Sequence, residues 1–112
     1  MTHQQKYPLE LSPQELQELW VNNPTLLVLD VREKAELLLS SIQGTSHIPM
    51  NELTLKGPLL NPKSHIITLC HHGYRSLQAA LYFRELGFTK VQSLKGGIDA
   101  WSRLIDSSVP LY

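Results

Sequence analysis

The chain has a single cysteine among its 112 residues. One thiol excludes an internal disulfide, a CxxC redox pair and a zinc site rich in thiolates. The chain also lacks an excess of charge, because ten lysines and arginines balance ten aspartates and glutamates. A neutral chain has no bulk attraction to nucleic acid, to an anionic membrane surface or to an acidic substrate. We therefore expect neither nucleic acid nor a membrane among its partners.

Long apolar runs and linkers are also missing. No segment approaches the roughly 20 apolar residues that span a bilayer, and the N-terminal stretch has no apolar region typical of a secretion signal. No internal repeat or low-complexity tract divides the chain. With 42% hydrophobic and 18% charged residues, the composition is that of an ordinary globular protein. We expect a single cytoplasmic domain over residues 1–112, present as a monomer.

Apolar segments alternate with helical segments along the chain. We predict strands at residues 25–30, 46–49, 64–69 and 90–94. The more apolar of these do not alternate with polar residues, which is typical of strands buried on both faces. Capping signals and helical spacing predict helices at residues 13–22, 32–39, 50–55, 75–86 and 96–104. This order of elements predicts an α/β domain with a mainly parallel sheet.

Two of the helices have the clearest signals. Ser12 and Glu15 form a capping box around Pro13 at the start of the first helix. We expect that helix to bury one face, which holds Leu16, Leu19 and Trp20. The helix at 75–86 is expected to end at Gly87 and to bury its apolar side chains, which are Leu77, Ala80, Leu81 and the aromatic residues.

The functional edge of the sheet can be located from the ends of its strands. Asp30 and Cys70 each stand at the carboxyl end of a buried apolar run. In open α/β sheets, ligands bind beyond the carboxyl ends of the strands. The lone thiol is therefore expected at that edge.

The segment after the strand at 64–69 reads LCHHGYRS and leads into a helix. A cysteine reacts as its thiolate, and a helix N-terminus favours an anion through its unpaired N–H groups and roughly half a positive charge. Gly73 lets the backbone curl its amides inward as an anion nest, and Arg75 adds a fixed positive charge. These features favour a reactive Cys70 and a pocket for a small anion.

Plainer interpretations of the same residues stay open. Cys70 can be a small buried apolar residue, and His71 and His72 can be exposed loop residues. A metal site is not expected, because adjacent histidines rarely point at one ion and no acidic residue stands three or four positions away. A Cys–His acyl-transfer pair is weak, because neighbouring loop residues diverge. Tyr74 is expected to shape the mouth of the pocket.

Four motifs occur in order along the chain and together resemble the rhodanese family of sulfurtransferases, in its stand-alone single-domain form. The first is LDVRE at residues 29–33, and the third is the loop LCHHGYRS, which fits Cys-x-x-Gly-x-Arg-Ser. The last is LGFTKVQSLKGGIDAW at residues 86–101. The second motif lies between LDVRE and the loop and consists of isolated residues of the family pattern, which are Glu36, Ile42, Gly44, Ile48 and Pro49. The resemblance covers residues 9–105, which we take as the core of the domain.

The chain departs from the family pattern at one turn. Ser40 and Ser41 stand where the family has Gly-His, and Thr45 stands where alanine is usual. The family's small residues shape a turn near the mouth of the site. We expect the change to alter the local backbone or the specificity and to leave the chemistry intact.

The resemblance implies a five-stranded sheet with helices on both faces and a two-step reaction without metal or cofactor. Cys70 would take the outer sulfur of an anionic donor such as thiosulfate as a persulfide. A thiophilic acceptor, cyanide or the thiol of a small molecule or protein, would then remove that sulfur. The loop that would bind the donor and stabilise the persulfide consists of His71, His72, Gly73, Tyr74, Arg75 and Ser76.

The residues themselves indicate supporting roles around the loop. Arg75 would attract the donor or brace the loop through a salt bridge, and Asp30 would accept hydrogen bonds from the loop. Arg32 and Glu36 are expected to form a structural ion pair with each other. We expect turn or packing roles for Gly96, Gly97 and Trp101.

Two other classes compete with sulfur transfer. A cysteine phosphatase or arsenate reductase also uses a thiolate in an anion-binding loop, but its loop has five residues between cysteine and arginine, whereas four separate Cys70 from Arg75. A protein-interaction module that keeps the fold without catalysis usually loses the cysteine. A module that carries a persulfide to a protein partner would use the same residues as the enzyme.

Overall fold

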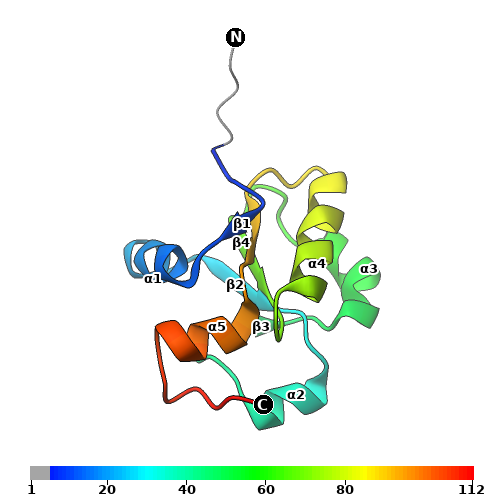
Figure 1. Ribbon diagram of the computed structural model, residues 1–112. Coiled ribbons are helices and arrows are strands. Elements are labelled where there is room, and N and C mark those ends of the chain that lie inside the picture. The colour runs from blue at the N-terminus through cyan, green and yellow to red at the C-terminus, as the bar shows by residue number, and fades with distance from the viewer. Residues whose placement is uncertain (1–5) are drawn as a thin grey trace.

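Five parallel strands form one sheet in the order β1-β5-β4-β2-β3 in the computed structural model, which describes residues 6–112 (Figure 1). The strands are β1 (Glu10–Leu11), β2 (Leu27–Asp30), β3 (Ser46–His47), β4 (Ile66–Leu69) and β5 (Val91–Leu94). Every neighbouring pair runs parallel. The predicted α/β class and five-stranded sheet are confirmed, and the expectations for the first five residues lie outside the described range.

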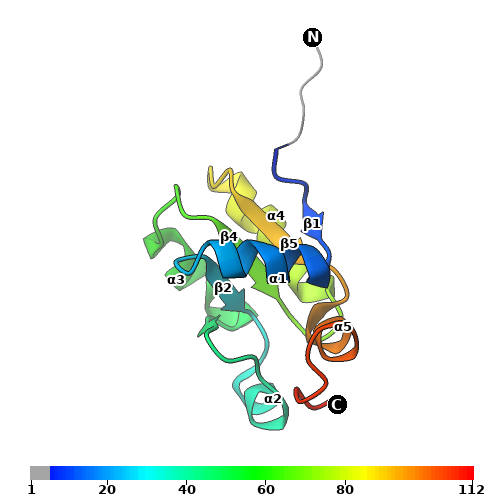
Figure 2. The same ribbon diagram turned by 90° about the vertical axis from the view of Figure 1, so that its left-hand side faces the viewer.

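Helices cover both faces of this sheet, as predicted. They are α1 (Pro13–Asn22), α2 (Lys34–Leu39), α3 (Leu53–Lys56), α4 (Tyr74–Glu85) and α5 (Gly97–Leu104), with short 3-10 turns η1 (Met50–Glu52) and η2 (Gly57–Leu59) around α3. Helices α1 and α5 lie on one face, and α3 and α4 lie on the other (Figures 1 and 2). Within residues 6–112, no helix has the length and apolar character needed to cross a membrane.

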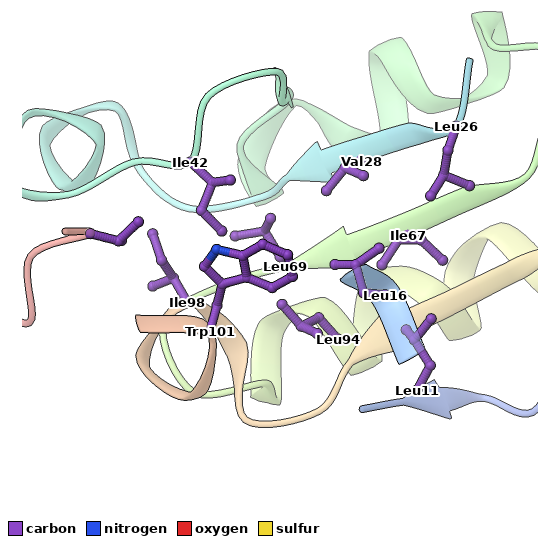
Figure 3. Close-up of a cluster of buried hydrophobic side chains, with 11 residues drawn as sticks. Leu11, Leu16, Leu26, Val28, Ile42, Ile67, Leu69, Leu94, Ile98 and Trp101 are labelled. Atoms are coloured by element: carbon purple, nitrogen blue, oxygen red, sulfur yellow. The ribbon is translucent and has the colours of Figure 1, made fainter. Parts of the chain in front are cut away.

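The strands are buried on both faces because successive side chains point to opposite sides of the sheet. Val28 and Ile67 belong to the core cluster beneath α1 and α5, whereas Leu29 and Ile66 belong to the cluster beneath α3 and α4. Figure 3 shows the first cluster, in which Trp101 of α5 packs among residues of the central strands. This two-sided burial explains why the apolar runs in the sequence do not alternate.

The expected start of α1 is present in the structure. The Ser12 hydroxyl accepts a hydrogen bond from the Glu15 amide at 3.1 Å, and the Glu15 carboxylate accepts one from the Ser12 amide at 2.9 Å. Leu16 is fully buried, while Leu19 and Trp20 are partly buried against the same core cluster. The predicted apolar face of this helix is therefore correct.

The buried face of α4 differs from the prediction. Leu81 is 46% exposed and Leu77 is half-buried, while Ala80 is buried as expected. The buried positions of the helix are Ser76, Ala79, Ala80 and Phe83. Ser76 faces inward because its hydroxyl lies 2.8 Å from that of Ser93 on β5. Because residues three to four apart share a helix face, Ser76 lies on the same buried face as Ala79, Ala80 and Phe83.

Candidate active site

The lone cysteine lies between β4 and α4, at the carboxyl edge of the sheet. Cys70 directly follows β4, and three residues later Gly73 stands at the N-cap of α4 with φ of +105°. A side chain at Gly73 would be strained at this φ, and its Cβ would lie 3.3 Å from the Gly96 nitrogen. Glycine therefore lets the chain turn back tightly over the sulfur.

Two backbone amides of the loop point at the Cys70 sulfur. The Gly73 N–H donates to Sγ at 3.1 Å and the Ser76 N–H donates at 3.3 Å. The thiol donates in turn to the Ser76 hydroxyl at 3.4 Å. Cys70 is only 1% exposed, so these donors act on the sulfur with little competition from water. The arrangement can stabilise negative charge on sulfur.

The start of α5 holds the other side of the loop. The Ile98 N–H donates to the Cys70 carbonyl at 2.8 Å, and the Asp99 N–H donates to the His71 carbonyl at 3.2 Å. A Cβ on Gly97, whose φ is +64°, would collide with both of these carbonyl oxygens. Gly97 is a close-packing residue, in line with the role expected for it.

Arg75 braces the far end of the loop. Its Nη1 and Nη2 atoms donate to the two carboxylate oxygens of Glu36 on α2, at 2.6 and 2.9 Å. The hydrogen bonds from Arg75 lower the pKa of Glu36 to about 2, and those to Glu36 raise the pKa of Arg75. Of the two roles considered for Arg75, the structure shows the brace.

The expected pairing of Arg32 with Glu36 is wrong. The Arg32 Nη2 atom lies 2.7 Å from a carboxylate oxygen of Asp30, and both side chains are buried. Toward Glu36, Arg32 reaches only the backbone carbonyl, at 3.4 Å, and it also donates to the Ser40 carbonyl at 2.8 Å. A buried charge needs a close partner, and the Glu36 carboxylate is already engaged by Arg75.

The expected bonds from the loop to Asp30 are also absent. Among residues 6–112, the hydrogen bonds to the Asp30 carboxylate come from Arg32, through its backbone N–H, its Nε and its Nη2. Asp30 is fully buried, and in the sheet it is paired with Leu69, the residue before Cys70. Asp30 thus supports the site indirectly, by holding Arg32.

Tyr112 is a residue of the site that sequence reasoning missed. Its ring stacks on His71, with centroids 3.8 Å apart and planes 6° from parallel. Its hydroxyl accepts a hydrogen bond from Arg32 at 2.9 Å and donates one to Glu36 at 3.0 Å. Burial raises the pKa of Tyr112. No motif or periodicity marks this position, so only the folded chain reveals it.

His71, His72 and Asp99 have ligand atoms within 4.8 Å of one another, and within residues 6–112 they are the group that could hold a metal. The acidic residue comes from α5, whereas the sequence prediction considered only neighbours along the chain. The two imidazoles are stacked at 3.9 Å with planes 28° apart, so their in-plane lone pairs run side by side. Asp99 is paired with Arg103 at 2.9 Å.

Two cavities flank the loop. One of about 480 Å³ is lined by Arg75 together with residues in or just before α2 and η1, which include Glu33, Lys34, Met50 and Glu52. The other, of about 320 Å³, is lined by Tyr74 and its neighbours, which include His72, Gly73, Leu77 and Lys95. Tyr74 is 82% exposed, which leaves its ring free at the rim of the second cavity.

The site is thus a single cysteine between a parallel strand and a helix, with two backbone amides donating to its sulfur. The family model of the rhodanese-like domain matches residues 12–104. The chain belongs to this family, and the resemblance noted in the sequence is confirmed.

Several of the matches cover most of both proteins. The chain is 34% identical over 91 residues to the thiosulfate sulfurtransferase GlpE of Ectopseudomonas mendocina, which is 81% of this chain and 82% of that protein. It is 33% identical to a rhodanese-related protein of Thermoplasma volcanium, whose crystal structure matches with a TM-score of 0.75 and covers 84% of this chain and 90% of that one.

Other relatives are much longer. The chloroplastic Rhodanese-like/PpiC domain-containing protein 12 of Arabidopsis thaliana is 35% identical over 89 residues, which are 76% of this chain but 30% of that protein. The chain spans between 20% and 30% of the length of three of the curated relatives it matches.

Proposed function

We propose that the protein is a sulfurtransferase that moves a sulfane sulfur through a persulfide on Cys70. The observation that carries the proposal is the pair of amides, from Gly73 and Ser76, that donate to the buried Sγ at 3.1 and 3.3 Å. A persulfide places negative charge next to that sulfur, where oriented N–H groups stabilise it without a metal. The likeness to thiosulfate sulfurtransferases supports the same reaction.

The first step loads the enzyme. The Cys70 thiolate attacks the outer sulfur of thiosulfate, a new S–S bond forms, and the S–S bond of thiosulfate breaks as sulfite leaves with the electron pair. In the second step an acceptor attacks the outer sulfur of the persulfide. The new bond gives thiocyanate from cyanide, or a persulfide from an acceptor thiolate, and the thiolate of Cys70 is restored.

A small anionic donor suits the charges around the loop. The side chain of Arg75 is 35% exposed and lines the larger cavity. Its guanidinium can therefore attract an anion while the Glu36 carboxylate keeps the arginine in place. With no second cysteine in the chain, the acceptor thiol must come from another molecule, either small or protein. Thiosulfate is the donor used in the assay, and the proposal does not depend on its being the donor in the cell.

The short loop separates this proposal from phosphoryl chemistry. Three equatorial oxygens of a phosphoryl group each need a donor at about 2.7–3.1 Å. The donors of Gly73 and Ser76 are instead directed at the sulfur itself. One sulfur atom fits close to the thiolate in such a tight ring.

Steady-state thiocyanate formation from thiosulfate and cyanide tests the proposal. We expect turnover by the wild-type protein and essentially none by Cys70→Ser, with circular dichroism showing that the variant is folded. A parallel assay with an aryl phosphate should detect no hydrolysis. Turnover by folded Cys70→Ser, or Cys70-dependent phosphate hydrolysis without sulfur transfer, would overturn the proposal.

A further inference from the structure

We propose that Tyr112 is a positioning residue for the Cys70 loop, because it contacts one end of the loop directly and the other end through Glu36. The inference rests on the proposed function only for its consequence on turnover. Tyr112 belongs to the segment that follows α5 and lies beyond the matched residues 12–104. Its contacts reach His71 at the start of the loop and, through Glu36, Arg75 at the far end.

The segment after α5 is anchored in the core before it reaches the loop. Val109 is buried in the same cluster as Trp101, its N–H donates to the Asp106 carbonyl at 3.1 Å, and its carbonyl accepts a bond from Ser102. From there the chain runs to α2, which it meets in both views (Figures 1 and 2). Tyr112 is thus held against the site by packing that does not itself touch Cys70.

The Tyr112 ring fixes the residue next to the nucleophile. His71 lies between Tyr112, at 3.8 Å and 6°, and the ring of His72, at 3.9 Å and 28°. The backbone of His71 is held independently by the Asp99 amide. Since the Nε2 atom of His71 is buried with no hydrogen-bond partner in the described structure, stacking is the main restraint on this ring.

The Tyr112 hydroxyl links the side chains of the two ion pairs, Arg32–Asp30 and Arg75–Glu36. It accepts a bond from Arg32, which is held by Asp30, and donates one to the Glu36 oxygen that Arg75 Nη2 also contacts. The carboxylate of Glu36 is thus held by Tyr112, by Arg75 and by the Glu33 amide, which donates to it at 2.8 Å. Arg75 lies directly before Ser76, whose amide donates to Sγ, so the position of Glu36 bears on the geometry at the sulfur.

The experiment compares Tyr112→Leu, Tyr112→Phe and the neighbouring control Leu111→Ala. Leu111 is 50% exposed and belongs to neither core cluster. Hydrogen exchange reports the Gly73 and Ser76 amides that bind the sulfur, and the Phe83 amide inside α4 serves as reference. Turnover of thiosulfate and cyanide is measured on the same samples, as separate kcat and KM.

Tyr112→Leu should speed exchange of the Gly73 and Ser76 amides by about 3- to 10-fold and lower kcat by a similar factor. This factor is the free energy of one aromatic pair expressed as a ratio of rates. Phe83 exchange and KM should change by less than about twofold, because the opening is local. Tyr112→Phe keeps the stacked ring but loses the hydroxyl bonds to Arg32 and Glu36, so its kcat should lie between those of Tyr112→Leu and the wild type. Leu111→Ala should match the wild type.

Two results would overturn the inference. One is Tyr112→Leu with unchanged exchange at Gly73 and Ser76 and unchanged kcat. The other is a uniform rise in exchange that includes Phe83 while kcat per folded molecule stays constant, which is the signature of a purely structural residue. If the wild type transfers no sulfur but Tyr112→Leu selectively speeds exchange of the Gly73 and Ser76 amides, the positioning role stands and the proposed function fails.

Discussion

The two arginine–carboxylate pairs beside the active loop are built differently. Asp30 and Arg32 lie two residues apart and are both fully buried, with side-chain exposures of 1% and 0%. Glu36 and Arg75 are 39 residues apart and partly exposed, at 17% and 35%. The buried pair cannot exchange its partner for water, whereas the half-buried pair can. The first pair is therefore a fixed part of the fold, whereas water can reach the second.

Breaking the buried pair should give the largest effect on stability. Arg32→Met leaves the Asp30 carboxylate buried with only a backbone N–H, and we expect a loss of about 3–5 kcal/mol in the free energy of unfolding. Urea unfolding at neutral pH measures it. The double variant Asp30→Asn with Arg32→Met should recover part of the loss, because no uncompensated charge stays buried. A loss below about 1 kcal/mol for Arg32→Met would contradict the comparison.

Breaking the half-buried pair should cost less stability. Glu36→Gln keeps the size and one acceptor for Arg75, so we expect a loss of about 1 kcal/mol in the free energy of unfolding. Turnover should fall more visibly, because the loop loses its brace at Arg75. The same urea titration, with kcat measured alongside, checks both. A stability loss equal to that of Arg32→Met would show that the two pairs do not differ.

The pH dependence sharpens the same distinction. The pKa of Glu36 is lowered from its ordinary value of 4.5 to about 2, chiefly by the hydrogen bonds from Arg75. A lowered carboxyl pKa adds stability above the unfolded value, and this stability is lost as pH falls through the folded value. The stability difference between wild type and Glu36→Gln should be nearly constant from pH 7 to pH 5 and should shrink as pH falls below about 4.5 toward 2. A difference that grows on acidification would contradict this origin.

The exposed pair on α5 should show the smallest effect and serves as the baseline. Arg103 is 61% exposed in its side chain and bonds to Asp99 one turn earlier. Arg103→Met should change the free energy of unfolding by less than about 0.5 kcal/mol, as is usual for such helix pairs. A larger loss in urea titration would mean that Asp99 needs its partner to hold the loop at His71.

The central strands could be predicted because they are buried on both faces and therefore apolar throughout. β1 could not, because its two residues owe their extended form to pairing with β5, a tertiary contact. The sequence pattern at residues 9–11 indicates only a short apolar stretch. The rotation of α4 was equally hidden, since it depends on a contact between Ser76 and Ser93.

The site was predictable only where its residues follow one another. Cys70 and its loop form one continuous segment, so their chemistry could be derived from neighbours. Arg32 and Glu36 have the spacing of a helical pair, but α2 begins at Lys34, so Arg32 is not on the helix and folds back onto Asp30. Tyr112 lies 76 residues from Glu36 and has no local signal.

The central claim is that Cys70 receives a sulfur atom and gives it up. Intact-mass measurement of the protein after incubation with thiosulfate, and again after addition of cyanide, tests it most directly. The wild type should gain the mass of one sulfur atom and lose it with cyanide, while folded Cys70→Ser should gain nothing. An unchanged wild-type mass after thiosulfate and after a persulfide donor, or an equal gain by Cys70→Ser, would contradict the account.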